Sequence, residues 1–145
     1  MDTVIKAMGG QIIVSDTQRN KLLIESFWKE FSSGNYEGAL KMMSENATWW
    51  VAGKTLLSGK YSKEEFTNLL SGVSSQAPNG IKVLPSSMTA EANRVSMEAT
   101  SYAEISNGKT YQNEYHFMFT IEHGEILTVK EYLDTEHVTE VFGEP

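Results

Sequence analysis

The fold is decided by residues 124–142, GEILTVKEYLDTEHVTEVF, near the end of the chain. Residues 125–134 alternate as a β-strand does, and the residues that follow have the spacing of a short helix. Asp134 or Thr135 can cap that helix, because a short polar side chain accepts a hydrogen bond from the first free backbone N–H groups. The stretch therefore predicts a last strand that leads directly into a closing helix.

Further strands precede this ending. Asn107-Gly108 and His123-Gly124 are typical of tight turns between antiparallel strands. They delimit strands predicted over residues 94–106 and 109–122. The strand before these two is interrupted at Pro85, which has no backbone N–H to donate. The second half of the chain therefore predicts a run of antiparallel strands.

The first half predicts helices around one strand. A helix from Asp16 to Ser33, capped by Asp16 or Thr17, follows from the recurrence of Leu23, Phe27 and Phe31 every four residues. A third helix follows from Ser62 and Glu65, whose spacing is that of a capping box. The elements between them are a short helix over 36–44, the strand ATWWVAG over 47–53, and a loop from Leu56 into the third helix.

The N-terminal residues 1–16 predict an arm ahead of a single domain over 17–145. Within the arm, QIIVS can form a short strand, and Gly9-Gly10 can act as a hinge before it. The arm has no basic start and no long apolar core, so it does not resemble a signal peptide. No stretch is long and apolar enough for a membrane span.

The charge and the cysteine count exclude several kinds of partner. The net charge is −7, from 19 acidic and 12 basic residues, and no basic cluster occurs. Nucleic-acid and membrane partners are therefore not expected. The chain has no cysteine, which fits a cytoplasmic location and excludes thiolate metal sites. His116, His123 and His137 lack the spacing of metal ligands, so we predict no metal and no cofactor.

The order of elements predicts an α+β protein: a cone-shaped, curved antiparallel sheet with about three helices packed on its concave face. Three segments in these places, residues 31–53, 57–66 and 115–138, resemble the SnoaL-like proteins. These belong to the superfamily of ketosteroid isomerase and nuclear transport factor two. The resemblance covers roughly residues 17–142 and implies the cystatin-like α+β barrel of that superfamily, with a small-molecule pocket and a homodimer formed through the outer sheet face.

The resemblance also allows a test of known mechanisms, position by position. The aspartate base and the two oxyanion donors of ketosteroid isomerase correspond to Val51, Phe27 and Tyr115. Val51 cannot take a proton and Phe27 cannot donate one, so that mechanism is excluded. The Asp–Arg–Asp set of limonene epoxide hydrolase corresponds to Thr100, Glu98 and Glu131, which keeps one carboxylate and replaces the arginine by an acid.

Glu131 is the leading candidate for a catalytic group. Alternation places it on the same side of its strand as Val129 and Leu133. A carboxylate in an apolar row is costly to bury unless it is paired or used, and desolvation raises its pKa toward neutrality. The alternative is that Glu131 pairs with a lysine such as Lys109.

A second acid would join it if Glu98 faces the pocket together with Thr100 and Tyr102. The alternative, equally open, is that this side of the strand faces solvent. On the next strand, Tyr115 shares a row with Asn113 and Phe117, while His116 and Met118 share the opposite row. The resemblance places the first row in the pocket and the second at the dimer interface.

We therefore predict a small-molecule isomerase, cyclase or dehydratase that works by acid/base chemistry without a cofactor on a hydrophobic ligand. The alternatives are a non-catalytic binding module of the same fold and an epoxide-hydrolase-like enzyme with an altered active site. The predicted catalytic residues are Glu131, Tyr115 and Glu98. The predicted substrate-binding residues are Phe27, Trp49, Val51, Tyr61, Thr100, Tyr102, Asn113, Phe117, Val129 and Leu133.

Overall fold

The computed structural model describes residues 5–8 and 11–145. The helices in this part of the chain are α1 (Asp16–Ser32), α2 (Tyr36–Leu40), α3 (Lys63–Ser74) and α4 (Thr135–Phe142). The strands are β1 (Ile5–Met8), β2 (Gln11–Val14), β3 (Met43–Val51), β4 (Gly59–Ser62), β5 (Lys82–Glu91), β6 (Arg94–Glu104), β7 (Thr110–Tyr111), β8 (Glu114–Glu122) and β9 (Glu125–Leu133).

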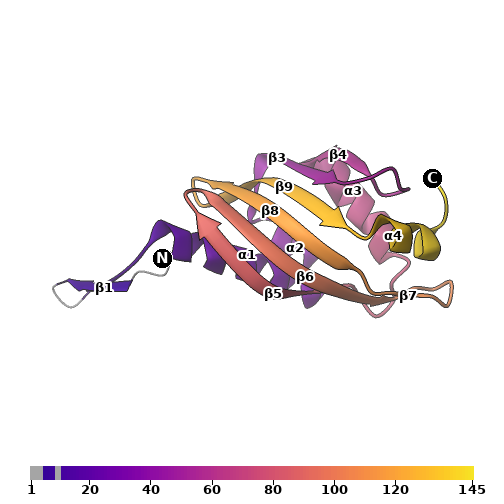
Figure 1. Cartoon of the computed structure of the whole chain (residues 1–145), viewed down its shortest axis with the longest axis horizontal. Coiled ribbons are helices and arrows are strands. Elements are labelled where there is room, and N and C mark those ends of the chain that lie inside the picture. The colour runs from indigo at the N-terminus through magenta and orange to yellow at the C-terminus, as the bar shows by residue number, and fades with distance from the viewer. Residues whose placement is uncertain (1–4, 9–10) are drawn as a thin grey trace.

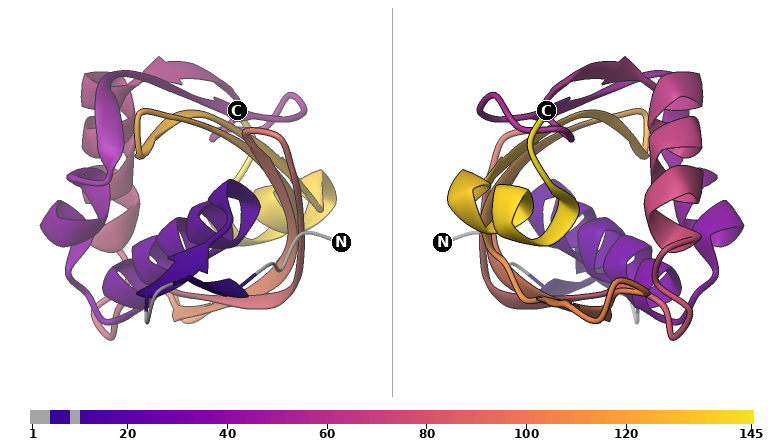
Figure 2. Two further views of the ribbon diagram at one scale, coloured as in Figure 1. Left: turned by 90° about the vertical axis from the view of Figure 1, so that its left-hand side faces the viewer. Right: turned by 90° about the vertical axis from the view of Figure 1, so that its right-hand side faces the viewer.

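The main sheet has the strand order β4-β3-β9-β8-β6-β5, with β7 paired to β6. Helices α1 and α2 lie behind the sheet and α4 lies at one end of it (Figure 1). The sheet curls around α1 without closing (Figure 2). The predicted α+β class, with a curved sheet and helices on its concave face, is confirmed. One pair departs from the antiparallel pattern, because β3 and β9 run parallel.

The parallel pair places Glu131 at the centre of the sheet. In β9 this residue lies opposite Val51 of β3 on one side and Phe117 of β8 on the other. A residue in a central strand has neighbours on both sides, so its side chain is surrounded by those of two further strands. The topology therefore holds Glu131 over the middle of the concave face.

The helices begin where polar side chains cap them. The Ser15 hydroxyl accepts a hydrogen bond from the Gln18 backbone N–H at 3.2 Å, so Ser15 caps α1 in place of the predicted Asp16 or Thr17. The capping box of Ser62 and Glu65 at the start of α3 is confirmed. Asp134 caps α4. The apolar stripe of α1 that faces the sheet consists of Ile24, Phe27, Trp28 and Phe31.

Three boundaries differ from the prediction. Helix α2 ends at Leu40 and β3 begins at Met43, several residues before the predicted strand. Residues 59–62 form β4 instead of a loop, because they pair with the end of β3. The strand predicted over 109–122 is divided into β7 and β8, and the break lies at Asn113, whose side chain bonds to backbone groups of another segment.

The N-terminal arm contains two short strands, β1 and β2, that pair antiparallel with each other. In Figure 1 this hairpin extends from the start of α1 away from the main sheet. The predicted hinge at Gly9-Gly10 lies outside the described residues. Within the described residues, no helix has both the length and the apolar character that crossing a membrane requires.

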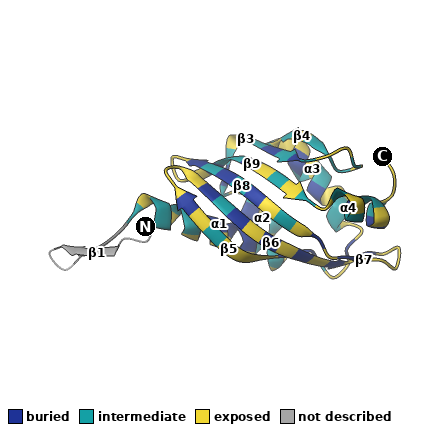
Figure 3. Ribbon diagram, viewed as in Figure 1, coloured by how far each residue is buried: buried dark blue, intermediate teal, exposed yellow. Residues whose placement is uncertain are grey.

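Burial alternates along the strands, as Figure 3 shows by colour. In β6 the buried residues are Val95, Met97, Ala99, Ser101 and Ala103, and the residues between them are exposed or half-buried. Along β6 the inner, concave side is thus mostly apolar, and the outer side carries polar and charged residues. This alternation decides which side chains can reach the interior.

Candidate functional site

A cavity of about 90 Å³ lies between α1, α3 and the concave face of the sheet. Most of its wall is apolar, and the polar side chains in it come from β7, β8 and β9. The residues that line it are Trp28, Phe31, Trp49, Val51, Leu57, Phe66, Leu69, Leu70, Val73, Ile81, Val83, Tyr111, Tyr115, Phe117 and Glu131.

Aromatic rings form the rigid part of the wall. The Trp49 indole stacks on Phe66 of α3 with 4.0 Å between ring centroids and 9° between planes. Trp28 packs against Phe117 at 4.9 Å and meets Trp49 edge to face at 6.1 Å. Offset and edge-to-face contacts of this kind favour one arrangement of the rings. The rings thereby hold the cavity in a defined shape.

Glu131 is the charged residue of the cavity wall. Its Oε1 accepts a hydrogen bond from the Trp49 indole Nε1–H at 2.9 Å. The residue as a whole is half-buried, but its carboxyl group lies deep enough for burial to dominate. Burial raises the pKa of the Glu131 carboxyl to about 7, against the opposing effect of the Trp49 hydrogen bond. Near neutral pH this carboxyl can therefore both take and return a proton.

Beside Glu131, three hydroxyl groups form a chain. The Tyr115 hydroxyl lies 2.9 Å from Ser101 Oγ and 3.1 Å from the Tyr111 hydroxyl. Burial, followed by the Glu131 charge, raises the pKa of Tyr111 to about 12. The pKa of Tyr115 is also raised, by burial first and then by Tyr111 and Glu131. Both phenols thus remain protonated and can act as hydrogen-bond donors.

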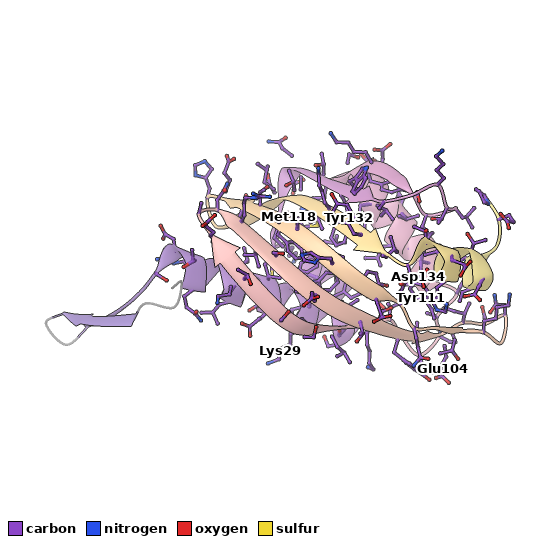
Figure 4. All side chains as sticks on the ribbon, viewed as in Figure 1. Lys29, Glu104, Tyr111, Met118, Tyr132 and Asp134 are labelled. Carbon is purple, nitrogen blue, oxygen red and sulfur yellow. The ribbon has the colours of Figure 1, made fainter. Side chains whose placement is uncertain are left out.

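Asn113 lies next to this chain but does not line the cavity. Its Oδ1 accepts hydrogen bonds from the backbone N–H groups of Glu114 at 2.7 Å and Asp134 at 3.0 Å. Its Nδ2 donates to the Asp134 carbonyl at 3.0 Å and to the Tyr111 hydroxyl at 3.1 Å. Asn113, a predicted substrate-binding residue, is thus outside the cavity wall, and its amide is bonded to the chain itself. Its amide joins the start of β8 to the start of α4. Its partners Tyr111 and Asp134 are labelled in Figure 4.

The predicted inward row of β6 is wrong. Glu98, Thr100 and Tyr102 are exposed on the outer face, and Glu98 Oε1 accepts a hydrogen bond from the Ser87 hydroxyl at 2.9 Å. The inward row is the one with Met97 and Ser101. Hydrophobic burial fixes the register of a strand, and a shift by one residue exchanges the two faces. Glu98 is thus removed from the candidate catalytic set.

The other predicted site residues fall into two groups, those that line the cavity and those that lie outside its wall. Trp49, Val51, Tyr115, Phe117 and Glu131 line the cavity together. The remaining four predicted binding residues lie outside the cavity wall. Phe27 and Val129 are buried in the core, Leu133 packs against it, and the Tyr61 hydroxyl donates to the Leu57 carbonyl at 2.8 Å.

Sequence reasoning missed Tyr111, the α3 wall and the further wall residues Trp28, Leu57, Ile81 and Val83. Tyr111 belongs to the same alternating row as Asn113, Tyr115 and Phe117, so extending that row by two residues would have indicated it. The sequence indicates the contribution of α3 to the cavity wall only weakly. Its apolar residues also fit an ordinary core-facing helix.

The half-buried aliphatic residues of the cavity wall come from α3 and the loop after β3. Leu57, Leu69 and Val73 line the cavity and are only half-buried, and the neighbouring Leu56 is exposed. The loop begins at Gly53, whose φ of +90° disfavours other residues and where a Cβ atom would lie 2.6 Å from Thr135 Cγ2. The loop therefore packs closely against the start of α4 at Thr135.

Among the described residues, no group of three or more His, Asp or Glu side chains is arranged to hold a metal ion. His137 has a structural position instead. Its Nε2 accepts the Gln112 backbone N–H at 3.0 Å, and its ring stacks on Tyr111 with 5.4 Å between centroids.

The chain belongs to the SnoaL-like domain family, whose model matches residues 24–129. No match was found among curated proteins. Several solved structures are similar. Bal32a from a soil-derived mobile gene cassette is 18% identical, with a TM-score of 0.78 over 86% of this chain and 96% of that one. TerC, co-crystallised with polyporic acid, is 21% identical, with a TM-score of 0.74 over 84% and 96%. A proposed SnoaL-like polyketide cyclase from Jannaschia sp. CCS1 is 12% identical, with a TM-score of 0.71 over 88% and 93%. Identities this low show a shared fold.

Proposed function

We propose that this protein is a cofactor-independent isomerase, cyclase or dehydratase in which Glu131 transfers a proton within a small hydrophobic substrate. One observation carries the proposal: a single carboxyl group in an apolar cavity, with a pKa raised to about 7 and an orientation fixed by Trp49. A base is most effective when its pKa lies near the working pH. The cyclase named in one of the similar structures fits this class of chemistry.

The step requires no further reactant. The Glu131 carboxylate removes a proton from a carbon next to a substrate carbonyl group, and the electron pair of the C–H bond moves into an enolate. The protonated Glu131 then returns the proton to another atom of the same substrate. A tyrosine hydroxyl of the cavity can donate a hydrogen bond to the enolate oxygen, which stabilises the charge that develops there.

The cavity indicates a small substrate. Its volume of about 90 Å³ is below the roughly 150 Å³ of an engineered cavity that takes up benzene. A ring of five or six atoms would need the half-buried wall at Leu69 and Val73 to recede slightly. We therefore expect single-ring carbonyl compounds to bind better than larger ones.

Cyclopent-3-enone provides a direct test of proton transfer. Moving one proton converts it to the conjugated cyclopent-2-enone, which is followed by ultraviolet absorbance. The protein should accelerate this conversion, and Glu131→Gln should lower the rate by about 10²-fold or more, because an amide cannot shuttle a proton. Glu98→Gln, the matched change on the outer face, should leave the rate unaltered. Equal rates for the wild type and Glu131→Gln would instead support the binding module, the second candidate.

We also propose a homodimer through the outer sheet face. Trp50 contacts Tyr132 edge to face at 5.1 Å, and Lys130 Nζ lies 5.6 Å from the Trp50 ring. Met118 and Tyr132 lie on the same face (Figure 4). Exposed apolar groups that gather over several strands are typical of an interface. Sedimentation at micromolar concentration should give a dimer, and Met118→Lys should give a monomer. A monomeric wild type would contradict this prediction.

A cytoplasmic location and the absence of nucleic-acid and membrane partners remain predictions from composition and charge.

A further inference from the structure

The hydroxyl chain of Tyr111, Tyr115 and Ser101 contains more hydrogen atoms than its members can use among themselves. Each hydroxyl has one hydrogen, so the chain has three, but only two oxygen–oxygen contacts join its members. Tyr115 is the donor in one contact or the other, and in either case one hydrogen is left at an end of the chain. It belongs either to Ser101 or to Tyr111.

The amide of Asn113 limits what Tyr111 can do. Because Asn113 Oδ1 accepts two backbone N–H groups, the orientation of the amide is fixed and Nδ2 must be the donor to Tyr111. The Tyr111 oxygen is therefore an acceptor in that contact. If Tyr115 also donates to it, the hydrogen of Tyr111 is free for a third partner.

The two ends of the chain differ in their surroundings. Tyr111 lines the cavity, whereas Ser101 is buried behind it and accepts the Asn113 backbone N–H at 3.1 Å. The Tyr111 ring is also held in place, since it stacks on His137 and meets Phe142 edge to face at 5.1 Å. An acceptor oxygen of a ligand in the cavity can therefore receive a hydrogen bond from the Tyr111 hydroxyl.

We propose that Tyr111 is the group that binds the substrate oxygen, and that Asn113, Tyr115 and Ser101 position its hydroxyl for this purpose. The inference rests on the proposed function and specifies its substrate class: a small cyclic compound with one carbonyl oxygen, bound with that oxygen at Tyr111 and the neighbouring carbon toward Glu131. A substrate oxygen at Tyr111 would select the arrangement in which Ser101 donates to Tyr115 and Tyr115 donates to Tyr111.

Two ligands of nearly equal shape separate this hydrogen bond from hydrophobic binding. Cyclopentanone has a carbonyl group where methylenecyclopentane has a C=CH₂ group. NMR titration should show that the wild type prefers the ketone by roughly two- to tenfold, the usual range for one net hydrogen bond. Tyr111→Phe should abolish the preference, and Tyr102→Phe, the same change on the outer face, should keep it. The preference should also persist in Glu131→Gln, which separates this inference from proton transfer.

The infrared band of the bound ketone gives a reading that a merely structural role of Tyr111 would not change. In the wild type the C=O stretch should shift to lower wavenumber than in hexane, and the shift should disappear in Tyr111→Phe. The proposal is overturned if neither probe binds, if the ketone is not preferred, or if the preference survives in Tyr111→Phe. Should that variant fail to fold, an unshifted carbonyl band in the wild type overturns it alone.

Discussion

The wild type should lose stability relative to Glu131→Gln as the pH rises from about 5 to 8. Burial raises the pKa of Glu131 from 4.5 to about 7 in the folded protein, so between these values the folded state binds the proton more tightly than the unfolded state. The contribution to stability is complete below the unfolded pKa and is lost as the pH passes the folded pKa. The loss amounts to at most about 3 kcal/mol, at 1.36 kcal/mol per pKa unit.

Chemical denaturation at several pH values, followed by tryptophan fluorescence, measures this difference. The free energy of unfolding of the wild type minus that of Glu131→Gln should fall between pH 5 and 7 and level off by pH 8. The comparison removes the effects of groups common to both proteins, including Glu65, whose pKa is lowered by its hydrogen bonds to Ser62. Glu98→Gln should run parallel to the wild type. If the free energy of unfolding of Glu131→Gln also varies with pH as that of the wild type does, the Glu131 carboxyl is hydrated in the folded protein.

Trp49→Ala should be the most destabilising single change in the site, lowering the free energy of unfolding by about 3–5 kcal/mol. Only 1% of Trp49 is exposed, and its ring stacks on Phe66. Its removal also takes away the donor that holds Glu131. Urea denaturation gives the size of the loss from the midpoint and the slope.

Two variants separate these contributions. Trp50→Ala, which removes the same side chain from the half-buried outer face, should cost clearly less. Trp49→Phe keeps an aromatic ring but loses the N–H group, so the pKa of Glu131 should rise further because the Trp49 hydrogen bond lowers it. If Trp49→Ala and Trp50→Ala lower the free energy of unfolding equally, the prediction that Trp49 contributes most to stability is wrong.

The site was predictable where residue type and alternation agreed. Glu131 stood out as a carboxylate in an apolar row, and the structure places it in the cavity with Trp49, Tyr115 and Phe117. For Glu98, alternation alone leaves a pocket-facing and a solvent-facing side chain equally open, and the structure places it on the outer face. Val95, Met97 and Ala99 form the apolar row of β6, and the burial of that row decides the register.

Asn113 shows a different limit. A polar residue in an inward row can bind a ligand or can satisfy backbone groups, and the sequence is the same in both cases. In the structure its amide makes four hydrogen bonds to the chain itself. Only the approach of Asp134, 21 residues away along the chain, settles which use applies.

The sequence by itself determined the α+β class, the capping box of α3, and Glu131 as a carboxylate in an apolar strand, because these depend on contacts and patterns within a few residues. The tertiary structure decided the rest. It set β9 parallel to β3, brought Trp49 to Glu131, and joined Tyr111, Tyr115 and Ser101 into one chain. Such contacts form between residues distant in sequence, and they depend on how the whole sheet curls and how the helices pack against it, which no local pattern records.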